Sequence, residues 1–406
     1  MALVSLDAGL SDADVALRDT VHRFAAEVMR PVGRELDRMA DPADVIAPSS
    51  PLWHAFDRYR QLGLDATAEP ETDADPAHQA LVSAVVNEEL GWGDAGLAIS
   101  FGVSNFHRLF ARMSGDQELI DRFCTPSSRE IGCWAVTEPD HGSDSLTFTE
   151  RHWRDPALHA NCVARRKGDD FVINGQKSAW VSNGSIATVA ALFCTIDDDK
   201  GFENGGVALV PLDRPGVSRG RPLDKLGQRA LNQGEIIFDD VHIPASYMLI
   251  GPELYAFTVE AVLALANSAM GSCFVGCGRA ALELALDYAQ TRVQGGVPIA
   301  QHQSVKGRLF RMFSRVEAAR SLARRVAVYN GANPPLVQYS IASKTFCTST
   351  AFEVASDALQ IFGGNGLTRE YPIEKIMRDA RASMIEDGCN EVLSIVGAAK
   401  LYEQGQ

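Results

Sequence analysis

The 406-residue sequence lacks several features that would each assign it to a class of protein. Its eight cysteines include no CxxC pair, which fits reduced thiols in a cytoplasm. No apolar run reaches the roughly 18–20 residues that cross a membrane. The N-terminal stretch "MALVSLDAGLSDADVALRD" has neither the basic start nor the apolar core of a secretory signal. We therefore expect a cytoplasmic protein without a membrane partner.

Positive charge is scarce as well. The formal net charge is −14, whereas nucleic-acid binders usually carry a basic surface, so we expect no nucleic-acid partner. There is no GxGxxG after a strand and no GxxxxGK[ST], which argues against a doubly wound dinucleotide fold. His152, His159 and Cys162 match no zinc spacing, so we expect a polar loop there and no metal site.

The residue pattern of the sequence changes from one typical of helices to one typical of strands, and then back to helices. Residues 1–130 read mostly as helix, and residues 248–406 return to helix. Between them, residues 131–247 hold short β-branched runs separated by Gly, Asp and Pro: "DFVINGQ", "TVAALFCTID", "GGVALVPL" and "GEIIFDDVHI". Asn174-Gly175 is a hairpin-type turn signal. The pattern predicts an α+β protein of three domains with these boundaries.

Local signals place several helices and loops. A helix is expected over 11–39 with Ser11 as its cap, and again over 78–92. Residues 41–51 and 67–77, rich in Pro, Asp and Ala, read as loops. Two long helices follow, one over about 336–361 that ends at Gly363-Gly364, and one over 304–327. The apolar stripe of the latter comprises Leu309, Phe310, Phe313, Val316, Leu322 and Val326.

Two stretches each combine a tryptophan with hydroxyl groups. "CWAVTEPDHGSDS" at 133–145 runs from a strand into a turn where Gly142 and Ser143 present free backbone and a hydroxyl, and "WVSNG" follows at 180–184. Two indoles beside hydroxyl donors suit a flat heteroaromatic ligand that needs a stacking wall and polar contacts. The alternative is that both tryptophans belong to the core.

Taken together and in order, the motifs resemble those of the acyl-CoA dehydrogenase family. They are TEPxxGSD, NGxK followed by W-[ST]-N-G, "DKLGQR…FDDVHIP", "RVQGGVPIAQHQ", "QIFGGNGLTREYPIEKIMRDAR" and "EDGCNEV", and they span nearly the whole chain. The resemblance implies an N-terminal helical domain, a middle β-barrel-like domain, a C-terminal four-helix bundle and FAD as cofactor. It also implies an acyl-CoA or related acyl thioester as substrate.

The resemblance also assigns residues to the cofactor. The family's wall around the flavin ring corresponds to Trp134, Val136, Thr137, Gly142, Ser143, Trp180 and Ser182. Positions that hold the diphosphate and adenosine correspond to Arg292, Gln294, His302 and Gln303, with Cys389 and Glu391 as further cofactor contacts. A backbone segment that reaches the cofactor of a neighbouring subunit corresponds to Gln360, Gly363 and Gly364, which implies a homo-oligomer, dimer or tetramer.

The catalytic position departs from the family pattern of aromatic, glutamate and glycine. Aligned on Gly388, the base is Asp387, and Glu386 takes the place of the aromatic residue. Aspartate is roughly 1.5 Å shorter than glutamate, and a displacement of about 1 Å can cost on the order of 100-fold in rate. Either the backbone or substrate sits closer here, or Glu386 has become the base, or the reaction differs.

Other departures lie near the expected substrate site. Asn267 stands where the family has an arginine, and we expect it to contact the substrate together with Ser143 and Gly388. Gly295 replaces a usual phenylalanine, and an insertion at 145–160 lengthens a nearby loop. We expect α,β-dehydrogenation of the acyl group, with Asp387 as base, hydride transfer to the flavin and an external acceptor such as an electron-transfer flavoprotein. The alternatives are another flavin reaction (oxidase, elimination or hydroxylation) or a non-catalytic binding homologue.

Overall fold

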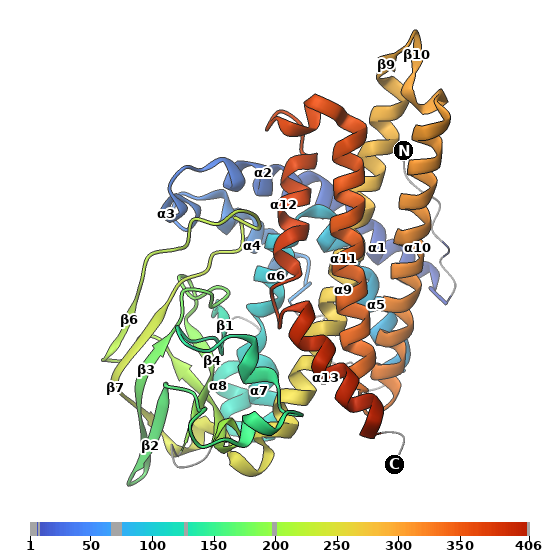
Figure 1. Ribbon diagram of the computed structural model, residues 1–406. Helices are drawn as coiled ribbons and strands as arrows, with labels where there is room; N and C mark the ends of the chain where they lie inside the picture. Colours follow the sequence, from blue (N-terminus) through green and yellow to red (C-terminus); the bar gives the residue numbers. More distant parts are fainter. Residues whose placement is uncertain (1–5, 7–8, 66–74, 126–128, 197–200, 404–406) are drawn as a thin grey trace.

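The computed structural model describes residues 6, 9–65, 75–125, 129–196 and 201–403. Figure 1 shows three parts: short N-terminal helices, a twisted sheet to one side, and long helices that run the height of the molecule. This is the predicted α+β architecture of helical, β and helical parts. Strand β1 begins at Gly132 and helix α9 at Pro252, and strand β8 (Met248–Ile250) lies within the part from residue 248 that was predicted to be helical.

The N-terminal part begins as one long helix. Ser11 caps it through a capping box with Asp14, as the sequence indicates. The helix then passes through a π-helical turn, Ala25–Met29, before it ends at Arg38. The helices of this part are α1 (Asp12–Phe24), α2 (Arg30–Arg38), α3 (Pro42–Val45), α4 (Pro51–Gln61), α5 (Pro76–Gly93), α6 (Ala95–Val103), α7 (Phe106–Ser114) and α8 (Gln117–Phe123).

The loop predicted over residues 41–51 was partly wrong. A one-turn helix, α3, forms there because Asp41 accepts a hydrogen bond from the backbone N–H of Ala43 and Pro42 supplies the first helical residue. Of the loop predicted over 67–77, residues 67–74 lie outside the described part of the chain. Helix α5 begins at Pro76, two residues before the predicted start at residue 78, with Asp75 as its cap.

The middle part is an eight-stranded mixed sheet in the order β6-β7-β3-β2-β4-β5-β8, with β1 paired in parallel with β4. All four predicted strands are present. The strands are β1 (Gly132–Ala135), β2 (Val163–Lys167), β3 (Asp170–Lys177), β4 (Val189–Thr195), β5 (Gly205–Pro211), β6 (Val217–Arg219), β7 (Ile236–Pro244) and β8 (Met248–Ile250), and a separate hairpin is formed by β9 (Val293–Gln294) and β10 (Val297–Pro298).

The hairpin turn predicted at Asn174-Gly175 was wrong, because both residues lie inside β3. Here β3 carries a bulge against β7, and Gly175 adopts φ +136°. A Cβ atom at Gly175 would come within 2.5 Å of the Cα of Cys162, so the glycine lets two backbones approach each other. The Asn174 side chain bonds to Asp240 of β7 instead of closing a turn.

The C-terminal part is a helical bundle around the 40-residue helix α9. Among the described residues, only α9 is long and apolar enough to cross a membrane, and 78% of its most apolar stretch is buried in the protein, as in the core helix of a bundle. The location of the protein in the cell therefore stays a prediction. The helices are α9 (Pro252–Thr291), α10 (Gln303–Ala332), α11 (Val337–Phe362), α12 (Ile373–Ser383) and α13 (Asn390–Glu403).

Helices α10 and α11 match the two long helices predicted for this region. Helix α11 ends at Phe362, followed by Gly363 at φ +60°. One member of the α10 stripe was assigned wrongly: Phe310 is 68% exposed, whereas Leu309, Val316 and Val326 are buried. Met312 is buried instead, because residues three apart, such as Leu309 and Met312, lie on the same face of a helix, whereas the adjacent residues Leu309 and Phe310 do not.

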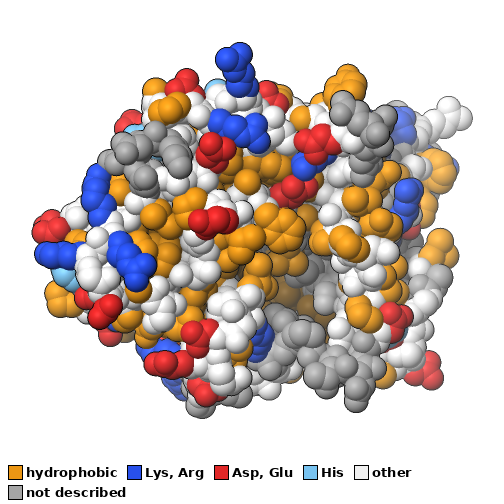
Figure 2. All heavy atoms as spheres, turned by 90° about the horizontal axis from the view of Figure 1, so that it is seen from below, with side chains coloured by type: hydrophobic (Ala, Val, Ile, Leu, Met, Phe, Trp, Pro, Cys, Tyr) orange, Lys and Arg blue, Asp and Glu red, His pale blue; other side chains and the backbone are white. Residues whose placement is uncertain are grey.

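The insertion at 145–160 belongs to the core that joins the sheet to the bundle. Trp153 is completely buried and stacks with Phe202 and Tyr255 at centroid distances of 6.4 and 5.9 Å. Leu146 and Phe148 join the same apolar cluster as residues of α9 and α13. Seen from below, hydrophobic side chains gather in the middle of the molecule around a hollow (Figure 2).

Candidate active site

The acid pair lies in the turn between α12 and α13. Asp387 has φ +52° and Gly388 φ +88°, so two successive residues are left-handed. A Cβ atom at Gly388 would approach Leu393 to 2.8 Å, which explains the glycine at this position. The turn is closed by the N–H of Asn390, which donates to the carbonyl of Met384 at 3.0 Å. Both acids are thereby held half-buried between two helices.

The environment makes both acids weaker than usual. Burial raises the pKa of Glu386 to about 7. The charge of Asp387 also raises this pKa, whereas the charge of Lys225 lowers it. Burial also raises the pKa of Asp387, opposed by Lys344. The pKa values of both acids are thus shifted in the same direction. Hence the pKa values alone do not assign the base.

Lys344 of α11 is a site residue that the sequence reading missed. Its side chain is completely buried, and its Nζ donates to the carbonyl of Gly388 at 2.8 Å and to Oδ1 of Asn390 at 2.9 Å. Burial lowers the pKa of Lys344 to about 8, although Asp387 and Glu386 raise it. A lysine on a buried helix face was the available signal, since such a residue needs partners.

Ser143 connects the sheet to this turn. The backbone N–H of Cys389 donates to Oγ of Ser143 at 3.0 Å, which brings together residues that are 246 positions apart. The expected free N–H of Gly142 is not free, because it donates to Oδ1 of Asp144 at 2.6 Å. The insertion supports this loop: Nε1 of Trp153 donates to the carbonyl of Ser145, whose hydroxyl donates to the carbonyl of Gly142.

The two tryptophan stretches lie side by side. The N–H of Ser178 donates to the carbonyl of Thr137 at 2.9 Å, and Nδ2 of Asn183 reaches the carbonyls of Ser100 and Gly132. Asn183 is completely buried and left-handed, at φ +61°. The segment 180–184 is therefore fixed along the end of β1. The predicted cofactor residues in this region are called the sheet group. They are Trp134, Val136, Thr137, Gly142, Ser143, Trp180 and Ser182, together with Cys389, which is bonded to Ser143.

The tryptophans of the sheet group have different surroundings. Trp134 is half-buried and stacks on Phe106 at 5.4 Å, and its indole Nε1 has no hydrogen-bond partner in the described residues. Trp180 is 58% exposed, which is unusual for so large an apolar side chain and argues against the core alternative for this residue. An exposed indole beside a half-buried one provides surface for a flat ligand.

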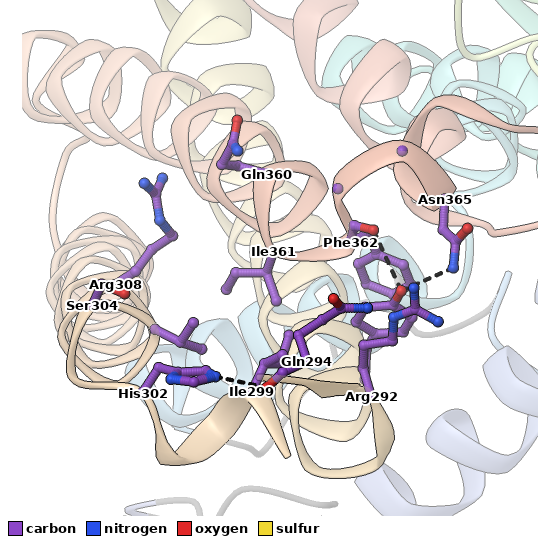
Figure 3. A pocket seen from close by; sticks show the side chains of 14 residues that line it. Arg292, Gln294, Ile299, His302, Ser304, Arg308, Gln360, Ile361, Phe362 and Asn365 are labelled. Carbon is purple, nitrogen blue, oxygen red and sulfur yellow. Dashed lines mark hydrogen bonds between the residues drawn. The ribbon is translucent and has the colours of Figure 1, made fainter. Parts of the chain in front are cut away.

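A second group lines a cavity at the end of the bundle. The cavity measures about 550 Å³ and lies between the β9–β10 hairpin, the start of α10 and the end of α11 (Figure 3). Nε2 of His302 is 3.0 Å from the carbonyl of Gln294 and ties the hairpin to α10. The guanidinium of Arg292 is paired with no carboxylate among the described residues. The predicted cofactor residues that line this cavity are Arg292, Gln294, His302, Gln360, Gly363 and Gly364, which we call the bundle-end group.

The two groups do not meet within one chain. Figure 1 places the β9–β10 hairpin at one end of the bundle, away from β1 and β4, where the sheet group lies. Gln303 is exposed at the first turn of α10, beside this cavity, and Glu391 is exposed on α13. Asn267 is completely buried in α9, and its Oδ1 has no partner within the described part of the chain.

Comparison with known proteins agrees with this architecture. The chain matches the acyl-CoA dehydrogenase N-terminal domain over residues 11–128, the middle domain over 133–241 and the C-terminal domain over 259–402. The chain belongs to the acyl-CoA dehydrogenase family. It is 30% identical to the rat mitochondrial short-chain specific acyl-CoA dehydrogenase over 397 residues, which cover 97% of this chain and 90% of the relative.

Two further relatives have similar coverage. Cyclohex-1-ene-1-carbonyl-CoA dehydrogenase of Geobacter metallireducens is 31% identical over 390 residues, 95% of this chain and 97% of that protein. The structure of butyryl-CoA dehydrogenase from Megasphaera elsdenii superposes with a TM-score of 0.84 at 26% identity, covering 98% of this chain and all of the other. The protein is therefore an FAD-dependent oxidoreductase of the acyl-CoA dehydrogenase type.

The residues present fit FAD. The oxygens of Ser143 and Ser182 accept hydrogen bonds from the protein, so each hydroxyl retains a proton that it can donate to a ring acceptor. Arg292 offers an unpaired cation at the edge of a cavity, as a diphosphate requires. These properties are divided between the sheet group and the bundle-end group.

Proposed function

We propose that the protein oxidises an acyl-CoA to its α,β-unsaturated product, with Asp387 as the base. The observation that supports this role is the geometry of its turn. Asp387 is half-buried, directly precedes the left-handed Gly388, and is followed by Cys389, whose N–H binds Ser143 of the sheet group. The carboxylate is thus attached to the segment that contacts the flavin-binding loop.

The chain's own groups favour proton removal at this position. Desolvation raises the pKa of Asp387, which makes its carboxylate a stronger base than an exposed aspartate. Lys344 anchors the turn through the carbonyl of Gly388 and provides a positive charge that stabilises the ionised form. In this proposal Asp387 removes the proton alpha to the thioester carbonyl. Bound FAD supplies the acceptor for the hydride that leaves the beta carbon.

Glu386 is the competing candidate. Its Oε2 is buried without a hydrogen-bond partner in the described residues, and its pKa of about 7 would suit a base near neutral pH. However, its charge is influenced most strongly by Lys225 of the loop that follows β6, which lies on the side of the sheet domain. We therefore assign proton removal to Asp387 and an electrostatic role to Glu386.

Substrate, acceptor and assembly are further parts of the proposal. The relatives named above act on acyl-CoA thioesters, which supports coenzyme A as the carrier. Asn267, whose buried Oδ1 has no partner among the described residues, is the polar group that we assign to the substrate. Electrons then leave for an external acceptor such as an electron-transfer flavoprotein. The separation of the sheet group from the bundle-end group supports a homo-oligomer in which two chains complete each FAD site.

Anaerobic reduction of the flavin by a panel of acyl-CoA thioesters tests this function. We expect Asp387→Asn to retain FAD and to lose at least about 100-fold in the rate of flavin bleaching, since the amide keeps the volume and removes the base. Glu386→Gln is the matched control and should lose far less. A wild-type rate in Asp387→Asn together with a large loss in Glu386→Gln would reverse the assignment.

The same preparation separates dehydrogenase from oxidase chemistry. After substrate has bleached the flavin, slow reoxidation in air agrees with an external protein acceptor. Rapid reoxidation with release of hydrogen peroxide would favour the alternative flavin reactions, and a flavin that no thioester reduces would favour a non-catalytic homologue.

A further inference from the structure

A chain of hydrogen bonds leads from Lys225 to the hydroxyl of Ser182. Nζ of Lys225 donates to the carbonyl of Leu231 at 2.7 Å and to Oε1 of Gln233 at 2.8 Å. Nε2 of Gln233 donates to the carbonyl of Trp180 at 3.1 Å and approaches Oγ of Ser182 to 3.3 Å. Gln233 is only 4% exposed, so its amide has no bulk water to replace these partners.

The orientation of the Gln233 amide follows from its neighbours. An ammonium group can only donate and a carbonyl oxygen can only accept. The amide oxygen must therefore face Lys225, and the amide nitrogen must face the carbonyl of Trp180. These two constraints are independent and agree. The amide nitrogen consequently donates to Ser182, whose oxygen is the acceptor in that bond.

The backbone holds the two partners in place. Ser182 and Gln233 form an antiparallel bridge, and the N–H of Asn183 donates to the carbonyl of Asn232 at 2.9 Å. Because the oxygen of Ser182 is occupied as an acceptor, its proton points elsewhere, and no described residue accepts it. A serine hydroxyl fixed in this way is a donor for a ligand that lies against Trp180.

We propose that Lys225 and Gln233 are positioning residues that fix Ser182 as a hydrogen-bond donor to the flavin ring. The inference rests on the proposed FAD site but assigns residues outside it. Lys225 constrains the amide from one side and the carbonyl of Trp180 from the other, so both together fix its orientation. Burial lowers the pKa of Lys225 to about 8, whereas the nearby acids Glu386 and Asp379 raise it and Arg229 lowers it. The two acids therefore help to keep the lysine protonated.

Gln233→Glu tests the relay, because it keeps the shape of the side chain and removes the donor. Next to Lys225 the new carboxylate stays ionised and accepts the proton of Ser182, so the hydroxyl turns away from the flavin. We expect FAD to bind about 3- to 10-fold more weakly, which is the range for one lost hydrogen bond. The visible flavin spectrum should change as it does in Ser182→Ala.

A double-mutant cycle with Ser182→Ala separates the relay from a general structural effect. In the Ser182→Ala background, Gln233→Glu should weaken FAD binding by less than about 2-fold, because the group that it acts on is absent. Full additivity of the two losses, or unchanged affinity and spectrum in Gln233→Glu, would overturn the proposal. If wild-type protein binds no FAD, the proposed function fails instead, so the two failures are distinguishable.

Lys225 provides a second test if Gln233→Glu does not fold. Lys225→Met removes one of the two constraints on the Gln233 amide and should move the flavin spectrum part of the way toward that of Ser182→Ala, whereas Lys225→Arg keeps a permanent donor and should preserve the wild-type spectrum. Equal behaviour of the methionine and arginine variants would contradict a relay that depends on the donor.

Discussion

At the scale of single residues, the site is governed by carboxylates that are buried next to lysines. Glu386 and Asp387 are adjacent in sequence, yet each responds most strongly to a different cation, Lys225 for the first and Lys344 for the second. Neighbouring acids that interact release their protons in steps that belong to the pair. The kinetics of this site should therefore depend on pH in a way that reports both groups.

We expect the rate of flavin reduction to rise with pH on the acidic side. The base acts only after it has lost its proton, and burial raises the pKa of Asp387 above its ordinary value, so the rise occurs at higher pH than for an exposed aspartate. The charge of Asp387 helps to raise the pKa of Glu386 to about 7, so Glu386 is still protonated while Asp387 ionises. The rise should therefore come first from Asp387, and Glu386 adds a second ionisation near pH 7.

Glu386→Gln removes this second ionisation. The acidic limb of the pH profile should then be a single step set by Asp387, without the second change near pH 7. Single-turnover rates of flavin bleaching between pH 5 and pH 9 measure the profile in both proteins. An unchanged profile in Glu386→Gln would show that the two acids do not interact.

At the scale of elements, the insertion that contains Trp153 joins the sheet to the helical bundle. It fills the space between the sheet and the bundle with apolar side chains and bonds to the loop that carries Ser143. Its sequence, which contains two histidines and charged residues, gave little sign of this burial. The two aromatic side chains that reach inward, Phe148 and Trp153, decide the role of the segment.

Trp153→Ala should destabilise this junction. A fully buried tryptophan cut to alanine typically costs about 3–5 kcal/mol, and the loop of Ser143 loses the bond from the indole. We expect a lower melting temperature and weaker FAD binding, measured by differential scanning calorimetry and by FAD titration. Arg151→Ala, at an exposed position of the same turn, is the control and should change neither. A Trp153→Ala protein with wild-type FAD affinity would separate the insertion from the cofactor site.

At the scale of the whole molecule, the residues proposed for FAD lie in two separate places. Figure 1 shows the β9–β10 hairpin of the bundle-end group away from strands β1 and β4, near which the sheet group lies. Exposed aromatic side chains on the bundle, Phe310 of α10 and Phe346 of α11, are 68% and 44% accessible and provide apolar surface for a second copy. Both features favour an oligomer.

Mixing two defective variants tests whether the site is shared. Arg292→Ala damages the bundle-end group, and Trp180→Ala damages the sheet group. If two chains complete each site, random exchange into dimers should restore about a quarter of the sites, because each mixed dimer contains one intact and one doubly defective site. FAD bound per chain after exchange, with each variant alone as control, measures the recovery.

No recovery after proven exchange would mean that both groups serve the same chain. Sedimentation of the wild-type protein gives the independent check, since a monomer that binds FAD tightly is incompatible with a shared site. Dimer and tetramer are distinguished by the same measurement.

Much of this protein was readable from the sequence because it depends on neighbours in the chain. The cap at Ser11, the end of α11 before Gly363 and the four strands of alternating or buried pattern are local features, set by hydrogen bonds and side-chain spacing over a few residues. The motifs around Trp134, Trp180 and Gly388 likewise indicated the family without knowledge of contacts.

Features in which a long-range contact overrides a local preference became visible only in the tertiary structure. Asn174-Gly175 is a turn signal by itself, but the approach of Cys162 makes it a bulge within β3. The bond between Cys389 and Ser143 joins two segments whose meeting depends on how the bundle packs against the sheet. Local sequence does not predict such contacts, because their free energy comes from surfaces that are far apart in the chain until the protein has folded.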